Sequence, residues 1–170
     1  MFLNYIKEFF VKKSLKNNLN KFKNEAFTSN IQTIGLLVDE SNFRESKGII
    51  NDLISNGINP ENIKIAAYRG KLKKKKTYSD TTFGKKHINW KGGIMVDFLT
   101  EFVDTEFDLL ISYYEIEKPI LMMITSKSKA KFKVGFASVD EKLNRWMINT
   151  DLENYKLFIS ELFKYLKSIK

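Results

Sequence analysis

The feature that most constrains this sequence is the run Thr33–Glu40, which is apolar from Ile34 to Val38 and closes with two carboxylates. A short, continuous apolar run with β-branched residues near its ends is typical of a parallel strand buried on both faces. We therefore expect a central strand here, with the rest of the chain wound around it.

The residues after this run predict a β-α-β unit. Asn42 and Glu45 have the spacing of a capping box at the start of a helix, and Gly57 suits a left-handed position after its end. A second strand is expected over residues 63–68, close enough in sequence for a right-handed parallel crossover.

The same alternation continues to residue 170. We expect a helix over 94–103, a strand over 107–114, a helix with Pro119 in its first turn, a strand over 132–137, an edge strand over 145–148 and a closing helix capped by Asp151. This pattern predicts a single doubly wound α/β sandwich, Rossmann-like or flavodoxin-like, with four or five mainly parallel strands. We favour the strand order 2-1-3-4-5, with 3-2-1-4-5 as the alternative.

Two regions flank or interrupt this pattern: residues 1–27, a basic helical segment, and a long basic loop over 69–93 within the α/β domain of residues 28–170. The apolar residues of the first segment lie on two faces, so the helix either breaks near Ser14 or contacts different partners at its two ends. Docking on the domain, an anionic membrane surface and a homodimer contact remain open for it. No apolar run has the length of a membrane span and no signal-peptide core is present, so we expect a cytoplasmic protein, with a membrane-peripheral location as the alternative.

Positive charge is concentrated in these same two regions. The net charge is +9, yet residues 69–93 carry nine Lys or Arg against Asp80 alone, and residues 1–24 carry six Lys against Glu8. The remainder of the chain is mildly acidic. Such segregation points to an anionic partner. The alternative is that an AT-rich genome produced the lysine-rich composition without selection for binding.

Lysines and aromatic residues alternate along the 69–93 loop. Lysines bind phosphate backbones through counterion release, and aromatic rings stack on exposed bases, whereas the scarcity of Arg argues against reading of base edges. The predicted anion-binding residues are Arg69, Lys71, Lys73, Lys74, Lys75, Lys76, Lys85, Lys86 and Lys91, and the predicted stacking residues are Tyr78, Phe83 and Trp90. The alternative is a solvated loop in which Ile88 and Trp90 pack down as an anchor.

A second candidate site lies where the strands end, because open α/β sheets bind ligands beyond their carboxyl edges. Asp39, Glu40 and Glu115 there could hold a hard cation such as magnesium, or could instead cap helices or pair with nearby lysines. The residues predicted to line a pocket at this rim are Asp39, Glu40, Tyr113, Tyr114, Glu115 and Ser138.

Catalytic and cofactor motifs are missing from the sequence. His87 is the only histidine and there is no cysteine, which argues against a zinc site. The sequence also contains no G-x-S-x-G turn, which argues against a Ser–His–acid catalytic triad. The turn after the first strand has no glycine, so it does not suit a pyrophosphate. We therefore predict no catalytic residue, no metal and no cofactor.

Residues 126–136, together with the strand Phe107–Ile111 and the order of elements, resemble a family of short, uncharacterised bacterial proteins that carry a domain of unknown function. That resemblance implies the fold and no activity. The same stretch is similar, more loosely, to the Rossmann-like half-domain of nucleotide-sugar glycosyltransferases.

Three functions follow from these patterns. The first is a non-catalytic protein that binds an anionic polymer, RNA or a ribosome, through the basic loop. The second is an enzyme or degenerate enzyme that acts on a phosphorylated or nucleotide-sugar substrate at the strand rim. The third is a peripheral membrane adaptor that acts through the N-terminal helix.

Overall fold

A computed structural model describes residues 30–169 of the chain. The predicted N-terminal helix and the membrane and homodimer contacts assigned to it lie outside these residues. The elements in chain order are β1 (Ile34–Asp39), α2 (Ser46–Ser55), the 3-10 turn η1 (Pro60–Asn62), β2 (Ile63–Tyr68), β3 (Thr82–Phe83), the 3-10 turn η2 (Lys85–His87), α3 (Asp97–Asp104), β4 (Leu109–Tyr113), α4 (Pro119–Lys127), β5 (Phe132–Phe136), β6 (Trp146–Ile148) and α5 (Tyr155–Ser168).

The strands form one six-stranded, all-parallel sheet in the order β3-β2-β1-β4-β5-β6. The five strands expected from the sequence therefore lie in the favoured order 2-1-3-4-5, and the alternative order is wrong. The additional strand β3 is only two residues long and extends the edge beyond β2. Its brevity, inside a lysine-rich loop, explains why no pattern in the sequence indicated it.

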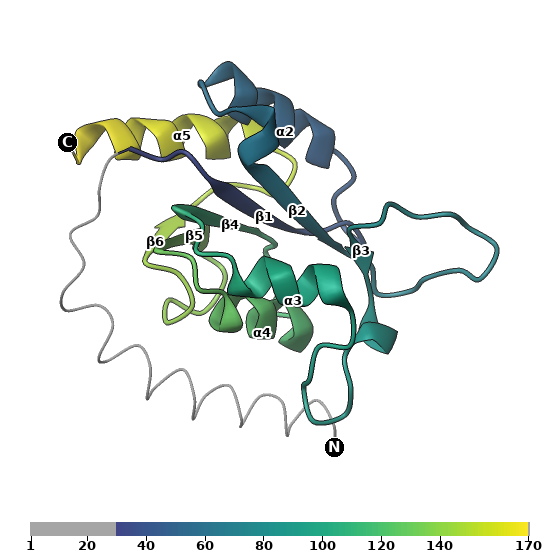
Figure 1. The fold of residues 1–170 in the computed structure, drawn as a ribbon. Coiled ribbons are helices and arrows are strands. Elements are labelled where there is room, and N and C mark those ends of the chain that lie inside the picture. The colour runs from purple at the N-terminus through teal and green to yellow at the C-terminus, as the bar shows by residue number, and fades with distance from the viewer. Residues whose placement is uncertain (1–29, 170) are drawn as a thin grey trace.

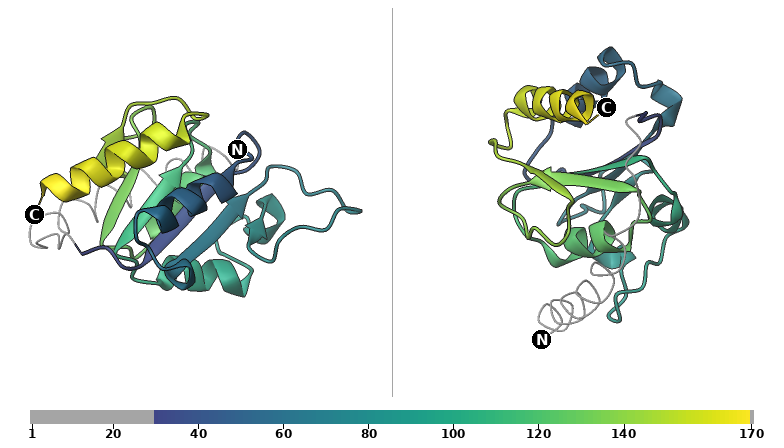
Figure 2. Two further views of the ribbon diagram at one scale, coloured as in Figure 1. Left: turned by 90° about the horizontal axis from the view of Figure 1, so that it is seen from above. Right: turned by 90° about the vertical axis from the view of Figure 1, so that its left-hand side faces the viewer.

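Helices cover both faces of the sheet. Figure 1 shows α2 and α5 above it and α3 and α4 below it, and Figure 2 shows the same layers from two further directions. Every residue of β1 is buried, as a strand in the middle of such a sandwich requires. None of the helices among residues 30–169 combines the length and apolar character needed to span a bilayer.

The alternation of side chains along the strands divides the core into two layers. Tyr113 of β4 contacts Phe43, Phe136 and Phe158 on the α5 side. On the other side Gly35 of β1 leaves room for Phe107 and Phe102, since a Cβ at Gly35 would stand 2.7 Å from the Phe107 ring. The apolar stripe expected for the closing helix is confirmed where it faces the sheet: Phe158, Ile159, Leu162 and Leu166 are all buried.

Two predicted helix caps are wrong. The helix α2 begins at Ser46 without a side-chain cap, so Asn42 and Glu45 do not form a capping box. In α5 it is the Asn154 side chain that caps the helix, by accepting a hydrogen bond from the Leu157 backbone N–H at 3.3 Å, and not Asp151. By contrast, Gly57 has the expected positive φ of 95° and Pro119 occupies the first turn of α4.

Candidate functional site

The winding of the chain changes direction between β1 and β4, and in open α/β sheets ligands bind at this point, beyond the carboxyl ends of the strands. An ion pair occupies this position. The ammonium of Lys118, the residue before α4, lies 2.5 Å from Asp39 Oδ2, and the Asp39 side chain is 2% exposed while that of Lys118 is 26% exposed. The pairing with lysine that the sequence left open for Asp39 is therefore confirmed.

Asp39 also binds the turn that follows β1. Its Oδ1 accepts a hydrogen bond from the Ser41 backbone N–H, and its Oδ2 accepts one from the Asn42 amide, both at 3.1 Å. This second contact is the physical reason why Asn42 does not cap α2, because its side chain is held at the end of β1. Both carboxylate oxygens of Asp39 are thus engaged within the chain.

A second ion pair ties the ends of β1 and β2 together. Arg69 lies 2.9 Å from Glu40 Oε2, and the Ser46 hydroxyl donates to Glu40 Oε1 at 3.0 Å. The Gly70 backbone N–H donates to the Ser41 hydroxyl oxygen at 2.8 Å. Arg69, which the sequence placed among the anion-binding residues, is therefore already paired with a carboxylate.

The predicted rim pocket does not include its two tyrosines. Tyr113 and Tyr114 are buried, and their hydroxyls bond to the Leu152 carbonyl oxygen at 2.5 Å and to the Thr125 hydroxyl at 2.8 Å. Burial raises the pKa of both phenols. Consecutive strand residues face opposite layers, and since both layers are covered by helices, neither ring reaches the rim.

The two remaining rim residues, Glu115 and Ser138, lie nearer the surface and form no metal site. The Ser138 hydroxyl donates to the Glu115 carbonyl oxygen at 2.9 Å, which joins the loops after β5 and β4. Among residues 30–169 no group of three carboxylate or imidazole side chains is placed to hold a metal ion. Two of the three carboxylates considered for a cation, Asp39 and Glu40, instead pair with Lys118 and Arg69.

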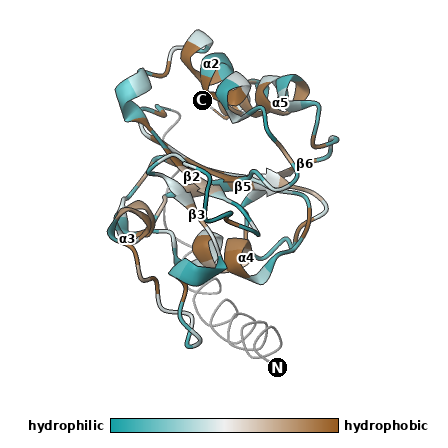
Figure 3. Ribbon diagram, turned by 90° about the vertical axis from the view of Figure 1, so that its right-hand side faces the viewer, coloured by the Kyte–Doolittle hydropathy of each residue, from teal (hydrophilic) through white to brown (hydrophobic). Residues whose placement is uncertain are grey.

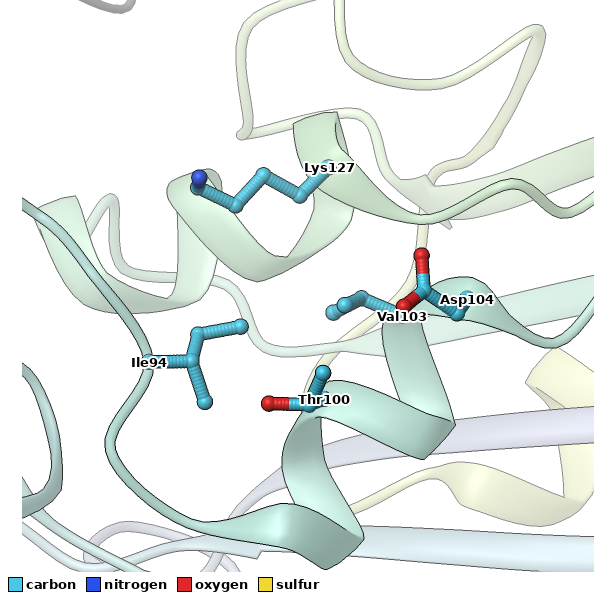
Figure 4. Close-up of a pocket in the computed structure, with 5 residues that line it drawn as sticks. All are labelled: Ile94, Thr100, Val103, Asp104 and Lys127. Carbon is cyan, nitrogen blue, oxygen red and sulfur yellow. The ribbon is translucent and has the colours of Figure 1, made fainter.

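A shallow pocket of about 290 Å³ lies elsewhere, between α3 and α4 (Figure 4). It contains none of the site residues predicted from the sequence. Its one carboxylate, that of Asp104, pairs with Lys129 at 2.8 Å, and the Thr100 hydroxyl donates to the Val96 carbonyl oxygen at 3.3 Å. The pocket is lined by Ile94, Thr100, Val103, Asp104 and Lys127.

The basic segment 69–93 forms two separate projections and not one arm. The loop between β2 and β3 extends to the right in Figure 1, and the turn after η2 extends downward. Figure 3, which views the molecule from the β3 edge, shows the β2–β3 loop in the colour of hydrophilic residues. β3 and η2 lie between the two projections and fix where each of them begins.

Tyr78 organises the first projection from within. Its hydroxyl accepts a hydrogen bond from the Lys73 backbone N–H at 3.0 Å. Arg69 and Lys76 lie over its ring, at 5.5 and 5.8 Å from the centroid. The half-buried ring therefore closes the loop, and the lysines that precede it in the chain remain exposed: Lys71, Lys73, Lys74, Lys75 and Lys76.

Phe83 is not available for stacking on a base. It is fully buried, with its ring centroid 5.5 Å from that of Tyr68. The prediction for this residue is wrong because Phe83 belongs to β3 and pairs in register with Tyr68. Trp90 has the opposite environment, since it is 70% exposed, whereas Ile88 is buried; of the two residues expected to anchor a solvated loop, only Ile88 does so.

Several lysines of the body differ in their partners from the lysines of the basic segment. Lys64, Lys118, Lys129 and Lys131 each lie within 2.9 Å of a carboxylate oxygen. Within the described part of the chain, no carboxylate pairs with the exposed lysines of the segment, which are Lys71, Lys73, Lys74, Lys75, Lys76, Lys85, Lys86 and Lys91. Lys47, Lys156 and Lys167 of the body are likewise exposed without an ion pair. What distinguishes the two projections is that eight such lysines are concentrated there within 21 residues.

Sequence reasoning missed two residues that shape these regions. Lys118 was considered only as the residue before Pro119, and nothing local in the sequence indicates that it meets Asp39. Asn89 fixes the second projection, as described below; the neighbouring Gly92-Gly93 and its own turn preference were the available signal.

A family model described as a family of unknown function (DUF6913) matches residues 7–169. The matched stretch includes both projections and most of the basic N-terminal segment. Comparison with curated proteins and with solved structures gives no match.

Proposed function

The chain belongs to the DUF6913 family, whose function is unknown, and on that premise we propose that it binds an anionic polymer, RNA or a ribosome, through the lysines of residues 69–93. Family membership supplies no chemistry, so the proposal depends on the residues themselves. The observation that carries it is the concentration, in the two projections, of exposed lysines that no carboxylate of the described residues pairs with.

Exposed lysines without carboxylate partners suit a phosphate backbone. Lys73–Lys76 are consecutive and all exposed, so each can release a counterion from a polyanion without first breaking an internal ion pair. A lysine pairs with phosphate as a point charge, whereas base edges are usually read by the planar fork of arginine. The one arginine of the segment, Arg69, is held by Glu40. The proposed binding is therefore driven by charge and not by base sequence.

The other two functions have less support. At the rim, a phosphorylated substrate would meet the carboxylates of Asp39 and Glu40, and would compete with them for Lys118 and Arg69. The membrane adaptor depends on residues 1–27, which lie outside the described residues.

The test compares two variants that lose the same charge. One replaces Lys73, Lys74, Lys75 and Lys76 with Gln; its control replaces the exposed Lys47, Lys156, Lys164 and Lys167 of α2 and α5 with Gln. The affinity of each for a fluorescently labelled 20-nucleotide RNA is measured by anisotropy over a range of KCl concentrations.

The proposal predicts a large difference between these variants. The loop variant loses at least tenfold in affinity at low salt, and its slope of log K against log salt becomes shallower by up to about 3, since each single-strand contact contributes roughly 0.7. The control variant keeps most of the RNA affinity and most of the salt dependence of the wild-type chain. Equal losses in the two variants, or RNA affinity of the wild-type chain that does not respond to salt, would contradict the proposal.

A further inference from the structure

The second projection, residues 87–95, is a β-hairpin with a fixed tip. Ile88 and Ile94 form an antiparallel bridge, and the Met95 backbone N–H donates to the His87 carbonyl oxygen at 2.9 Å. The Asn89 side chain closes the turn, because its Oδ1 accepts hydrogen bonds from the backbone N–H groups of Lys91 at 2.9 Å and Gly93 at 2.8 Å. The turn is therefore held by side-chain as well as backbone bonds.

The hairpin is anchored to the core on both sides of its tip. Ile88 is buried, and a Cβ built on Gly92 would stand 3.5 Å from the Met123 sulfur of α4. Gly92 also has a φ of +79°, a conformation that residues with a side chain rarely adopt. These contacts fix the position of the tip that carries the exposed Trp90 side chain.

Trp90 presents its indole to solvent although the tip around it is ordered. The side chain is 70% exposed, and the Lys91 ammonium lies 5.0 Å from the ring centroid. No Asp or Glu occurs between residues 81 and 96, whereas Lys85 and Lys86 of η2 are exposed beside the hairpin. The charged side chains of the hairpin and of the turn before it are therefore all cationic.

We propose that Trp90 is a stacking platform for an unpaired base, so that the RNA bound by this protein is single-stranded where it crosses the hairpin. This inference rests on the proposed function and names its substrate class. A nucleotide has a flat base that is joined through the ribose to a phosphate. The indole receives the base, and Lys91, whose ammonium lies 5.0 Å from the ring centroid, receives the phosphate. A rigid aromatic group loses little conformational entropy on binding, and bases of any sequence can stack on it.

An anionic membrane is the other surface that favours tryptophan with lysines. Shallow insertion into a bilayer depends on buried apolar area, and the hairpin offers only Trp90 and Met95 as exposed large apolar side chains. The position of Lys91 over the ring face would bring its charge into the bilayer along with the indole. The single-stranded polymer is therefore the better fit, and the vesicle becomes an arm of the test.

The experiment uses the intrinsic fluorescence of Trp90. The chain has two tryptophans, and Trp146 is stacked on Tyr165 with the ring centroids 4.0 Å apart. The variant Trp146→Phe keeps an aromatic ring in that stack and leaves Trp90 as the only indole. This full-length variant is titrated with a 20-nucleotide oligouridylate, with duplex RNA at equal phosphate concentration, and with vesicles that contain anionic phospholipid.

We expect the single strand to quench Trp90 emission and the duplex to quench it far less, although both bind through their phosphates. In the otherwise wild-type chain, Trp90→Ala should weaken single-strand binding by between about fivefold and a hundredfold and leave duplex binding unchanged. Trp90→Phe should restore part of the loss, because its ring still stacks.

Several results would overturn this inference. Equal quenching by duplex and single strand, or single-strand affinity that Trp90→Ala leaves unchanged, would exclude stacking. A blue-shifted emission with vesicles and no quenching by RNA would assign the tip to a lipid surface. If stacking is excluded in this way but the Lys73–Lys76 variant still loses salt-dependent RNA binding, only the stacking inference is wrong. If that variant binds RNA like the wild-type chain, the proposed function is wrong as well.

Discussion

The ammonium of Lys118 and the carboxylate of Asp39 form an ion pair 2.5 Å long at the point where the winding of the sheet changes direction. Asp39 ends β1 and Lys118 precedes α4, so the pair joins the central strand to the layer below it. It occupies the crevice in which open α/β sheets bind their ligands, so a ligand at the rim would have to compete with an existing ion pair.

Replacement of Lys118 by Met should destabilise the fold by about 3 kcal/mol, because it leaves the buried Asp39 carboxylate without its cation. Chemical denaturation measures the change. Lys64→Met is the matched control, since Lys64 and Glu101 form a pair 2.6 Å long at the surface and exposed pairs contribute little. The double variant Lys118→Met with Asp39→Asn should recover part of the loss, and similar losses from the two single variants would contradict this account.

The contact between Gly135 of β5 and Asn144 gives a second prediction. The Asn144 side chain is buried without a hydrogen-bond partner for either polar atom, and a Cβ at Gly135 would collide with its amide nitrogen. Gly135→Ala should therefore cost about 1–3 kcal/mol in unfolding free energy through overpacking. The smaller residue in Asn144→Ala should relieve that clash, so a double-mutant cycle by urea denaturation should show positive coupling; additive losses would exclude direct contact.

Asp108 makes stability depend on pH in the acid range. Partial burial alone would raise the pKa of its carboxyl, but hydrogen bonds from Lys131, Thr33 and Gln32 outweigh this and lower the pKa to about 2. Because the folded-state pKa lies below the ordinary value of 3.8, the resulting stability, about 2 kcal/mol, is present above pH 3.8. It is lost as the pH falls from there towards 2.

Unfolding free energies of Asp108→Asn, measured between pH 2 and 7, test this. The variant should be less stable than the wild-type chain at pH 7, and the difference should shrink as the pH falls below 4. Asp151→Asn, at an exposed position, should follow the wild-type profile. A difference in unfolding free energy between Asp108→Asn and the wild-type chain that stays constant down to pH 2 would contradict this link between the Asp108 pKa and stability.

His87 should titrate below its ordinary pKa of 6.5. Burial, followed by the positive charge of Lys86, lowers the pKa of this imidazole, and its Nδ1 accepts a hydrogen bond from the Gly84 backbone N–H at 3.2 Å. The neutral ring therefore stabilises the start of the hairpin above pH 6.5, and this stabilisation is lost as the pH falls through the lowered pKa. His87 is the only histidine, so one NMR titration of imidazole protons reads its pKa directly; a value at or above 6.5 would contradict the placement of the ring.

Much of the fold could be predicted because its signals are local. The apolar run at Ile34–Val38, the Pro119 that opens α4 and the stripe of α5 each report burial or helical period within one element. The favoured strand order 2-1-3-4-5 is also the observed one, although the sequence left the order 3-2-1-4-5 open. The two-residue strand β3 was missed because its length gives no period to detect.

The candidate site was less predictable, because exposure and pairing depend on neighbours that are distant in the sequence. Phe83 and Trp90 looked alike as aromatic residues among lysines, yet one is buried against Tyr68 and the other is 70% exposed. Tyr113 and Tyr114 end a strand, but the layers that cover them come from other parts of the chain.

The sequence by itself determined where this protein is apolar, where it is helical or extended, and that its positive charge is segregated. Only the tertiary structure decided which charges are neutralised, because an ion pair requires two groups to meet, as Asp39 meets Lys118 and Glu40 meets Arg69. The lysines of the two projections find no such carboxylate among residues 30–169, since the loops that carry them extend away from the sheet and its helices (Figure 1).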